Sequence, residues 1–217
     1  MIKLRDILNE IGDGSSKIFG YYQSSGSGFL DMKNFKLGTS LGIVNYGAYI
    51  APYFINADVK GKPLNVALQA VKVSPKDAKE ADPEVYDKYK SAVAKLGLDL
   101  DNPEIANNYV DLYVEFNAHY PDEKMRAQYN EPLLSVNDKT YLFRLMATIK
   151  EIMLELVNKH NANVISYTPL KGGNEEDSET ADLGRTKLYS IFIKNAFPGS
   201  KRIVDEDLVL HLIKPVK

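Results

Sequence analysis

The stretch that decides the fold runs from Thr140 to Leu170 and reads TYLFRLMATIKEIMLELVNKHNANVISYTPL. Large apolar residues recur in it at spacings of i, i+3, i+4 and i+7, which places them in one stripe on a helix. We therefore expect a long helix over residues 139–160. Asn161 is suited to the left-handed conformation that ends a helix, and a short buried strand over Val164–Tyr167 follows. The expected stripe comprises Leu142, Leu145, Met146, Ile149, Ile152, Met153, Leu156 and Val157.

Composition excludes several classes of protein. The 217 residues carry a formal net charge of -2, so no strong field attracts nucleic acid or an anionic membrane. The chain contains no cysteine, which excludes disulfides and thiolate zinc sites. It has no apolar run long enough for a transmembrane helix, and its charged N-terminus is not that of a signal peptide. We expect neither membrane nor nucleic-acid partners.

The remaining elements follow from shorter patterns. The run YVDLYVEF over Tyr109–Phe116 alternates, which predicts a strand with one face in the core and the other wet or against a partner. Polar composition predicts surface loops over residues 74–82 and 98–108. The other expected strands cover residues 19–23, 28–31, 43–55, 64–73, 133–136 and 207–213, and the other expected helices cover residues 83–96 and 185–197.

Together these elements predict an α+β (or α/β) fold. Its mixed sheet would be packed by the helix 139–160 and a second helix 185–197, with a β-rich N-terminal elaboration. The expected organisation is an amphipathic N-terminal helix over residues 1–14, a Gly/Ser/aromatic elaboration over 15–100 and an α/β core over 101–217. The last two parts would form one continuous domain.

The C-terminal half resembles uncharacterised small proteins of large tailed bacteriophages. The matching pieces are the strand-like Ile165-Ser166-Tyr167-Thr168-Pro169 and the element Gly184-Arg185-Thr186-Lys187-Leu188-Tyr189. The opening MIKLRDILNEI is similar to the short N-terminal helix of many such proteins. The resemblance implies a viral origin rather than an activity. It implies other phage structural proteins as partners, in a homo- or hetero-oligomer, and a location in the virion or otherwise in the host cytoplasm.

A second resemblance connects residues 187–197 to the late helix of GNAT acetyltransferases, where a Leu-Tyr pair occurs near the end of the fold. The R/Q-x-x-G-x-G/A loop that binds pyrophosphate in that family is missing before Tyr141 and before Arg185. A core helix is the simpler interpretation. If a ligand site exists near the strand Val164–Tyr167, Arg185 is the residue that would contact an anion there.

Aromatic residues in the Gly/Ser-rich first quarter form the main candidate surface. Tyrosine offers a large rigid contact area with a polar tip, which suits protein–protein interfaces, although half of these aromatics would simply fill the core. Lysines are too few nearby for a nucleic-acid stacking platform. The interface candidates are Tyr21, Tyr22, Phe29, Phe35 and Tyr46.

Catalytic and cofactor motifs do not occur. The glycines form neither a P-loop nor a dinucleotide fingerprint, and the three histidines lack metal-ligand spacing, so we expect no metal and no cofactor. These observations favour a structural or accessory protein of a phage particle over an enzyme. Two alternatives stay open: an intracellular phage enzyme with a GNAT-like core, and a host-factor inhibitor that binds through the acidic run 174–182.

Overall fold

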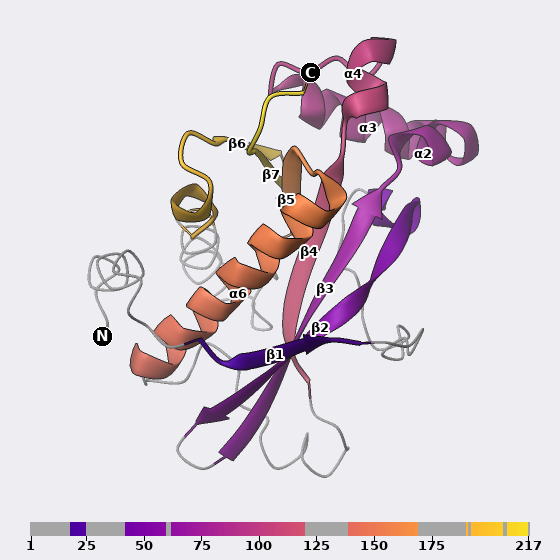
Figure 1. The fold of residues 1–217 in the computed structure, drawn as a ribbon. Helices are drawn as coiled ribbons and strands as arrows, with labels where there is room; N and C mark the ends of the chain where they lie inside the picture. The colour runs from indigo at the N-terminus through magenta and orange to yellow at the C-terminus, as the bar shows by residue number, and fades with distance from the viewer. Residues whose placement is uncertain are drawn as a thin grey trace, which may run out of the picture. The chain divides into compact units, whose positions relative to one another are not determined.

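The computed structural model describes residues 18–24, 42–59, 62–119, 139–168, 190, 192–205 and 208–216 (Figure 1). Residues 190 and 192–196 are helical. The named elements, in chain order, are β1 (Gly20–Gln23), the 3-10 helix η1 (Ile43–Asn45), β2 (Gly47–Val59), β3 (Lys62–Val73), α2 (Pro75–Ala81), α3 (Pro83–Ala94), α4 (Pro103–Asn108), β4 (Asp111–His119), α6 (Lys139–His160), β5 (Val164–Tyr167), β6 (Lys201–Asp205) and β7 (Leu208–Leu212).

The described strands form one mixed sheet in the order β1-β2-β3-β4-β5-β7-β6. Strands β4 and β5 run parallel, with Leu112 opposite Ile165, whereas β7 pairs antiparallel with both β5 and β6. A parallel pair needs a long crossover, and α6 supplies it between β4 and β5. The α+β fold with a mixed sheet and a long helix over 139–160 is confirmed.

The chain forms two compact units, and each is assembled from three separate stretches of sequence. The first unit comprises Met1–Gly28, Ala51–Gln69 and Glu115–Leu154, and the second comprises Phe29–Ile50, Ala70–Val114 and Glu155–Lys217. Strands β2, β3 and β4 and helix α6 therefore each contribute residues to both units. The expected division at residues 14 and 100 stays a prediction.

In the first unit, β1 is tied to α6 by side chains of the helix. The Phe19 amide donates to Thr148 Oγ1 at 2.8 Å, and Thr148 in turn donates to the carbonyl of Arg144 at 2.7 Å. The Arg144 guanidinium lies over the Phe19 ring at 4.1 Å from its centroid. Strand β1 then pairs antiparallel with β2, Tyr22 opposite Phe54. These contacts fix both the start and the register of β1.

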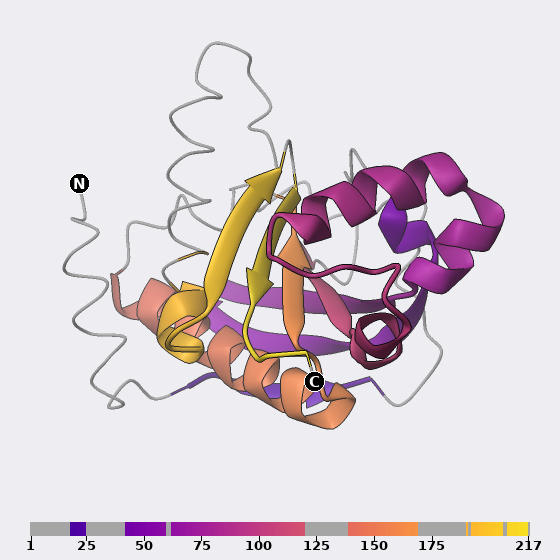
Figure 2. The same cartoon turned by 90° about the horizontal axis from the view of Figure 1, so that it is seen from above.

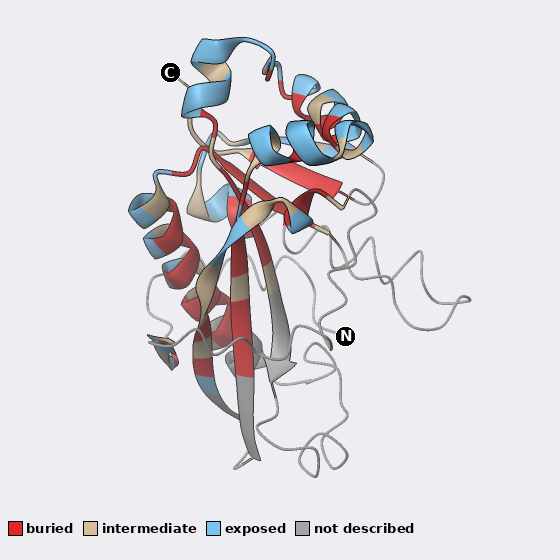
Figure 3. Ribbon diagram, turned by 90° about the vertical axis from the view of Figure 1, so that its right-hand side faces the viewer, coloured by how far each residue is buried: buried red, intermediate tan, exposed pale blue. Residues whose placement is uncertain are grey.

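Helix α6 buries the apolar stripe expected from its sequence (Figure 3). Seven of the eight stripe residues are buried, and the side chain of the eighth, Leu142, lies outside the described residues. The helix ends at His160, and Asn161 has a φ of 51°, the left-handed conformation expected for it. The buried stripe residues are Leu145, Met146, Ile149, Ile152, Met153, Leu156 and Val157.

In the second unit, α3 and the last turns of α6 lie on opposite sides of the strands β4, β5 and β7 (Figure 2). The residues facing α3 form a core with Tyr86, Tyr89 and Val93 of that helix. The strand residues in this core include Val71, Tyr113, Val164, Leu208 and Leu210.

Both faces of β4 are buried in the second unit, so the expected wet face is wrong there. Leu112 is 0% exposed on one face, and Asp111 and Tyr113 are 0% and 2% exposed on the other. The alternation itself is as predicted. The second face is dry because α3 covers it, and the sequence pattern of a single strand does not show what packs above it.

The two predicted loops are also corrected, since residues 74–82 contain α2 and residues 98–108 contain α4. Helices α2, α3 and α4 share one start signal: a capping side chain followed directly by proline. Ser74, Asp82 and Asn102 each accept a backbone N–H of the first turn, and Pro75, Pro83 and Pro103 follow them. Polar composition hid this signal, although it is visible in the sequence.

The sequence pattern does not predict strand β6. Its sequence KRIVD is mostly charged, and as the last strand in the sheet order it carries exposed side chains at Lys201, Arg202 and Val204. An edge strand needs little apolar character, which leaves a weak pattern. The predicted strand 43–55 also differs, because it begins with η1 before β2 starts at Gly47.

Gly47 is required by close packing between β2 and β3. A Cβ at this position would lie 2.5 Å from Val71 Cγ1 and 2.7 Å from the backbone oxygen of Lys72. Because a backbone atom cannot yield as a flexible side chain can, we expect Gly47→Ala to destabilise the protein by about 1–3 kcal/mol. Urea unfolding measures the change, and Gly20→Ala, whose Cβ would meet nothing within 4 Å, is the matched control. Equal stabilities of the two variants would contradict this account.

Candidate functional site

The second unit contains a cluster of polar side chains centred on the carboxylate of Asp111. Ser166 on the neighbouring strand β5 donates to both carboxylate oxygens at 2.9 Å. Tyr89, which reaches down from α3, donates to Oδ2 at 2.5 Å. The Tyr89 hydroxyl also bonds that of Tyr109 at 2.7 Å. The cluster thus joins a helix, two strands and the segment before β4.

The number of hydroxyl protons in this cluster matches the ionised form of Asp111. Three hydroxyl groups supply three protons for three contacts: Ser166 and Tyr89 donate to the carboxylate, and Tyr109 donates to Tyr89. A protonated Asp111 adds a fourth donor to the same three contacts, which leaves one O–H group without an acceptor in the cluster. Hydrogen bonding alone therefore favours the anion.

Burial favours the protonated form of Asp111, and its effect on the pKa outweighs that of the hydrogen bonds. Asp111 is 0% exposed, and loss of hydration raises its pKa from 3.8 to about 6, while the bonds from Tyr89 and Ser166 lower it. Burial and the nearby carboxylate also raise the pKa of Tyr89 and of Tyr109 well above 10. Among the described residues, no cation forms an ion pair with Asp111. The arrangement can take up and release a proton, but it presents no surface to a substrate.

His211 is a second buried titratable side chain. It is 1% exposed in β7, and its ring stacks on that of Tyr167 with centroids 6.0 Å apart. Neither ring nitrogen has a hydrogen-bond partner within the described part of the chain. Burial, and then the charge of Arg202 on the adjacent strand, lower the pKa of His211 to about 4. The imidazole is therefore neutral at pH 7.

Asp111 and His211 lie on opposite faces of the sheet. The register pairs Asp111 with Val164 of β5 but His211 with the next residue, Ile165, so successive positions place the two side chains on different sides. Next to His211, the Tyr167 hydroxyl bonds Ser190 Oγ at 2.9 Å and so joins β5 to the helical residues 190 and 192–196. Arg185, the expected anion contact at this end of β5, lies outside the described residues.

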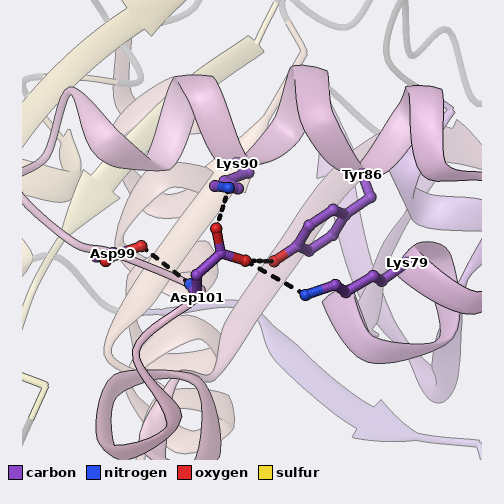
Figure 4. Close-up of polar contacts among 5 residues, drawn as sticks. All are labelled: Lys79, Tyr86, Lys90, Asp99 and Asp101. Carbon is purple, nitrogen blue, oxygen red and sulfur yellow. Dashed lines mark hydrogen bonds and ion pairs between the residues drawn. The ribbon is translucent and has the colours of Figure 1, made fainter.

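A third cluster is on the surface, where Asp101 accepts from three side chains (Figure 4). Lys79 of α2 donates at 3.3 Å, Tyr86 of α3 donates at 3.2 Å, and Lys90 of α3 completes the set. The bonds from Lys90 and then Lys79 lower the pKa of Asp101 below its ordinary value. This cluster ties the segment after α3 to both helices. Its charged groups are partly exposed to solvent and bond one another, so its role is structural.

The predicted interface residues fall in different environments. Tyr22 is 55% exposed on β1, with its ring 5.5 Å from that of Phe54. Tyr21 is half-buried, 6.2 Å from the ring of Tyr53. Tyr46 packs against the core of the second unit, and its hydroxyl donates to Asp82 at 3.2 Å. Their use as an interface stays a prediction. Phe29, Phe35 and the acidic run 174–182 lie outside the described residues.

Within the described ranges, no three His, Asp or Glu side chains come close enough together to hold a metal ion. In the same part of the chain, no helix is long and apolar enough to cross a membrane. The groups that sequence reasoning missed are Asp111 and its hydroxyl partners. The available signal was an aspartate between Tyr109 and Tyr113 in an apolar strand, because a carboxylate there needs hydroxyl donors if the face is covered.

Comparison with known proteins identifies no relative: no protein family, curated protein or solved structure matches the chain.

The Asp111 carboxyl group makes stability depend on pH. Its folded pKa is raised, so its stabilising contribution is complete below about pH 3.8 and is lost as pH rises through about 6. The difference corresponds to about 3 kcal/mol. Asp111→Asn cannot ionise, so in urea unfolding its free energy of unfolding should fall relative to that of the wild type on acidification from pH 7 to pH 4. An identical pH dependence in wild type and variant would refute the assignment.

The contribution of His211 to stability changes with pH in the opposite direction. Its folded pKa is lowered, so its contribution is complete above about pH 6.5 and is lost as pH falls through about 4. His211→Phe removes this loss, again about 3 kcal/mol. We expect the variant to gain stability on acidification while the wild type, in which the two groups offset each other, changes little. A wild-type-like profile in urea unfolding would contradict the burial of a neutral imidazole.

Proposed function

We propose that the protein acts through protein–protein contacts, as a structural or accessory component of a tailed-phage particle. The observation that carries the contact role is the exposed aromatic surface of β1 in the first unit, where Tyr22 projects beside Phe54. The sequence resemblance of the C-terminal half to phage proteins supports the viral setting.

This surface has the chemistry of a contact site. Ile18 and Tyr22 are 43% and 55% exposed, although both are large and apolar. Residues 18–24, IFGYYQS, carry no charge, so a partner need not supply a matching ion. Tyrosine rings of this kind lose little conformational entropy when they become buried, which makes them effective anchors.

The surface is also held in place before any partner arrives. Phe19 lies between the two exposed residues Ile18 and Tyr22, and it is buried beneath Arg144 and bonded through its amide to Thr148. Pairing of Tyr22 with Phe54 fixes the following residues. A surface that is already ordered loses less free energy on binding than a flexible one.

An enzyme with a GNAT-like core is the second candidate, and one observation favours it. The buried imidazole of His211, whose ring nitrogens have no partner among the described residues, stacks on Tyr167, near the strand where this hypothesis places a ligand site. The hydroxyl of Tyr167 in turn bonds Ser190. Buried polar atoms without partners are uncommon in native proteins and are enriched at functional sites. This candidate predicts a small-molecule ligand, whereas the contact role does not need one.

The test is co-sedimentation of the tagged protein with phage particles from infected cells. We expect wild-type protein in the particle fraction and a several-fold smaller fraction for Tyr22→Lys, because a charge would have to be desolvated in the contact. Val204→Lys is the control, since Val204 is 52% exposed on β6 in the second unit. Wild-type protein found only in the soluble extract would overturn the particle role. Equal effects of the two substitutions would overturn the assignment to β1.

A further inference from the structure

Helix α3 is the cover over Asp111. Tyr89 is 0% exposed and its hydroxyl touches the carboxylate from above, while Ser166 holds the carboxylate from the strand alongside. Three other α3 residues, Tyr86, Ala92 and Val93, are buried against the same face of the sheet. Water can hydrate Asp111 fully only if Tyr89, and with it α3, moves away.

We infer that α3 is a proton-controlled cover: it is held against the sheet while Asp111 carries a proton and opens more readily once Asp111 is ionised. The reason is the linkage between ionisation and hydration. An ionised carboxylate gains more from water than a protonated one, so the state in which α3 has opened and water has entered is favoured by loss of the proton. The contact between Tyr89 and Asp111 makes the helix the element that responds.

The other titratable groups around α3 do not produce this response. Asp101 is bonded to Lys79, Lys90 and Tyr86, and its lowered pKa keeps it ionised where Asp111 titrates. The raised pKa values of Tyr89 and Tyr109 keep both neutral. Other charged contacts of the helix with described residues include Glu84–Lys88, Lys95–Asp205 and the Asp82 cap.

Among the described residues, the core beneath α3 contains no charged group other than Asp111. The strands contribute apolar side chains, the hydroxyls of Tyr113 and Ser166, and Asp111 itself. Two further charged side chains lie on the same face of the sheet: Lys201 of β6, which donates to the Leu96 carbonyl at 2.8 Å, and Glu115 of β4. His211 titrates in the same pH range, but it lies on the opposite face of the sheet. Opening of α3 leaves His211 packed, whereas global unfolding exposes both groups. Local opening and global unfolding should therefore depend on pH in different ways.

Amide hydrogen exchange of the intact protein separates the two processes. After division by intrinsic exchange rates, the amides of Tyr89, Ala92 and Val93 report the opening equilibrium of α3. Between pH 4.5 and pH 7, an Asp111 pKa near 6 predicts an increase of that equilibrium by roughly twenty-fold. Over the same range, amides of β5 and β7 that exchange only on global unfolding should change far less, because His211 offsets Asp111.

Three variants decide the matter. Asp111→Asn should abolish the increase at α3, and Ser166→Ala, which removes a donor to the carboxylate, should move its midpoint to higher pH. Asp101→Asn is the control: it weakens the outer attachment of α3 at both pH values and should leave the twenty-fold ratio intact. The inference is overturned if α3 opening in the wild type is independent of pH, if Asp111→Asn keeps the increase, or if Ser166→Ala leaves the midpoint where it was.

Discussion

The parallel pairing of β4 with β5 is the constraint on which the rest of the second unit depends. Two parallel neighbours cannot be joined by a tight turn, so the chain must leave the sheet, travel back and re-enter. Helix α6 is that crossover, and the hydrogen bonds of Asn163 fix where the chain re-enters the sheet as β5. Its side chain accepts from the Val110 amide at 2.9 Å and donates to the Asn108 carbonyl at 2.6 Å. Its own carbonyl accepts from the Ile213 amide at 2.9 Å. One asparagine thereby aligns the starts of β4 and β5 with the end of β7.

Given this alignment, the two faces of the sheet in the second unit bury different titratable side chains, one acidic and one basic. The face under α3 contains an acid whose hydroxyl partners are matched to its ionised form. The other face contains a base whose ring nitrogens have no partner among the described residues. Both groups are driven toward their neutral forms by loss of water, so their effects on stability oppose each other as pH changes. A single titration curve of the whole protein would hide both.

Sequence reasoning was most successful where the apolar pattern is long. The stripe from Leu145 to Val157 predicted α6 to the residue, and Asn161 marked its end. Sequence reasoning was wrong where an element is defined by polar capping residues rather than by a repeating apolar pattern. Helices α2 and α4 are short and mostly exposed, and only their capping residues and prolines signal them. Strand β6 is defined by its neighbour β7 rather than by its own residues.

The polar cluster was beyond the reach of sequence for a different reason. The cluster brings together side chains from three elements: Asp111, Tyr89 and Ser166. Their contacts depend on the register of β4 with β5 and on where α3 packs on the sheet. The alternation of β4 shows which face of the strand carries Asp111. It does not show that this face is buried, because the helix that covers it lies earlier in the chain. Tyr22 is easier to single out as an interface candidate, because an uncharged aromatic pair is visible in the sequence itself, and its use as an interface stays a prediction.

The interleaving of the two units has a consequence for the order in which the protein can be made. The first unit needs residues as far as Leu154, and the second needs strand β7 near the end of the chain. During synthesis from the N-terminus, β1, β2 and β3 can pair as soon as they are made, because they are neighbours in the sheet, but neither unit is complete until segments synthesised long after them are available. Contacts so distant in sequence make for slow folding and a long exposure of unpaired strands. The nascent chain therefore carries incomplete units until the last segment of each has been made, and no continuous fragment contains all of one unit without also containing residues of the other.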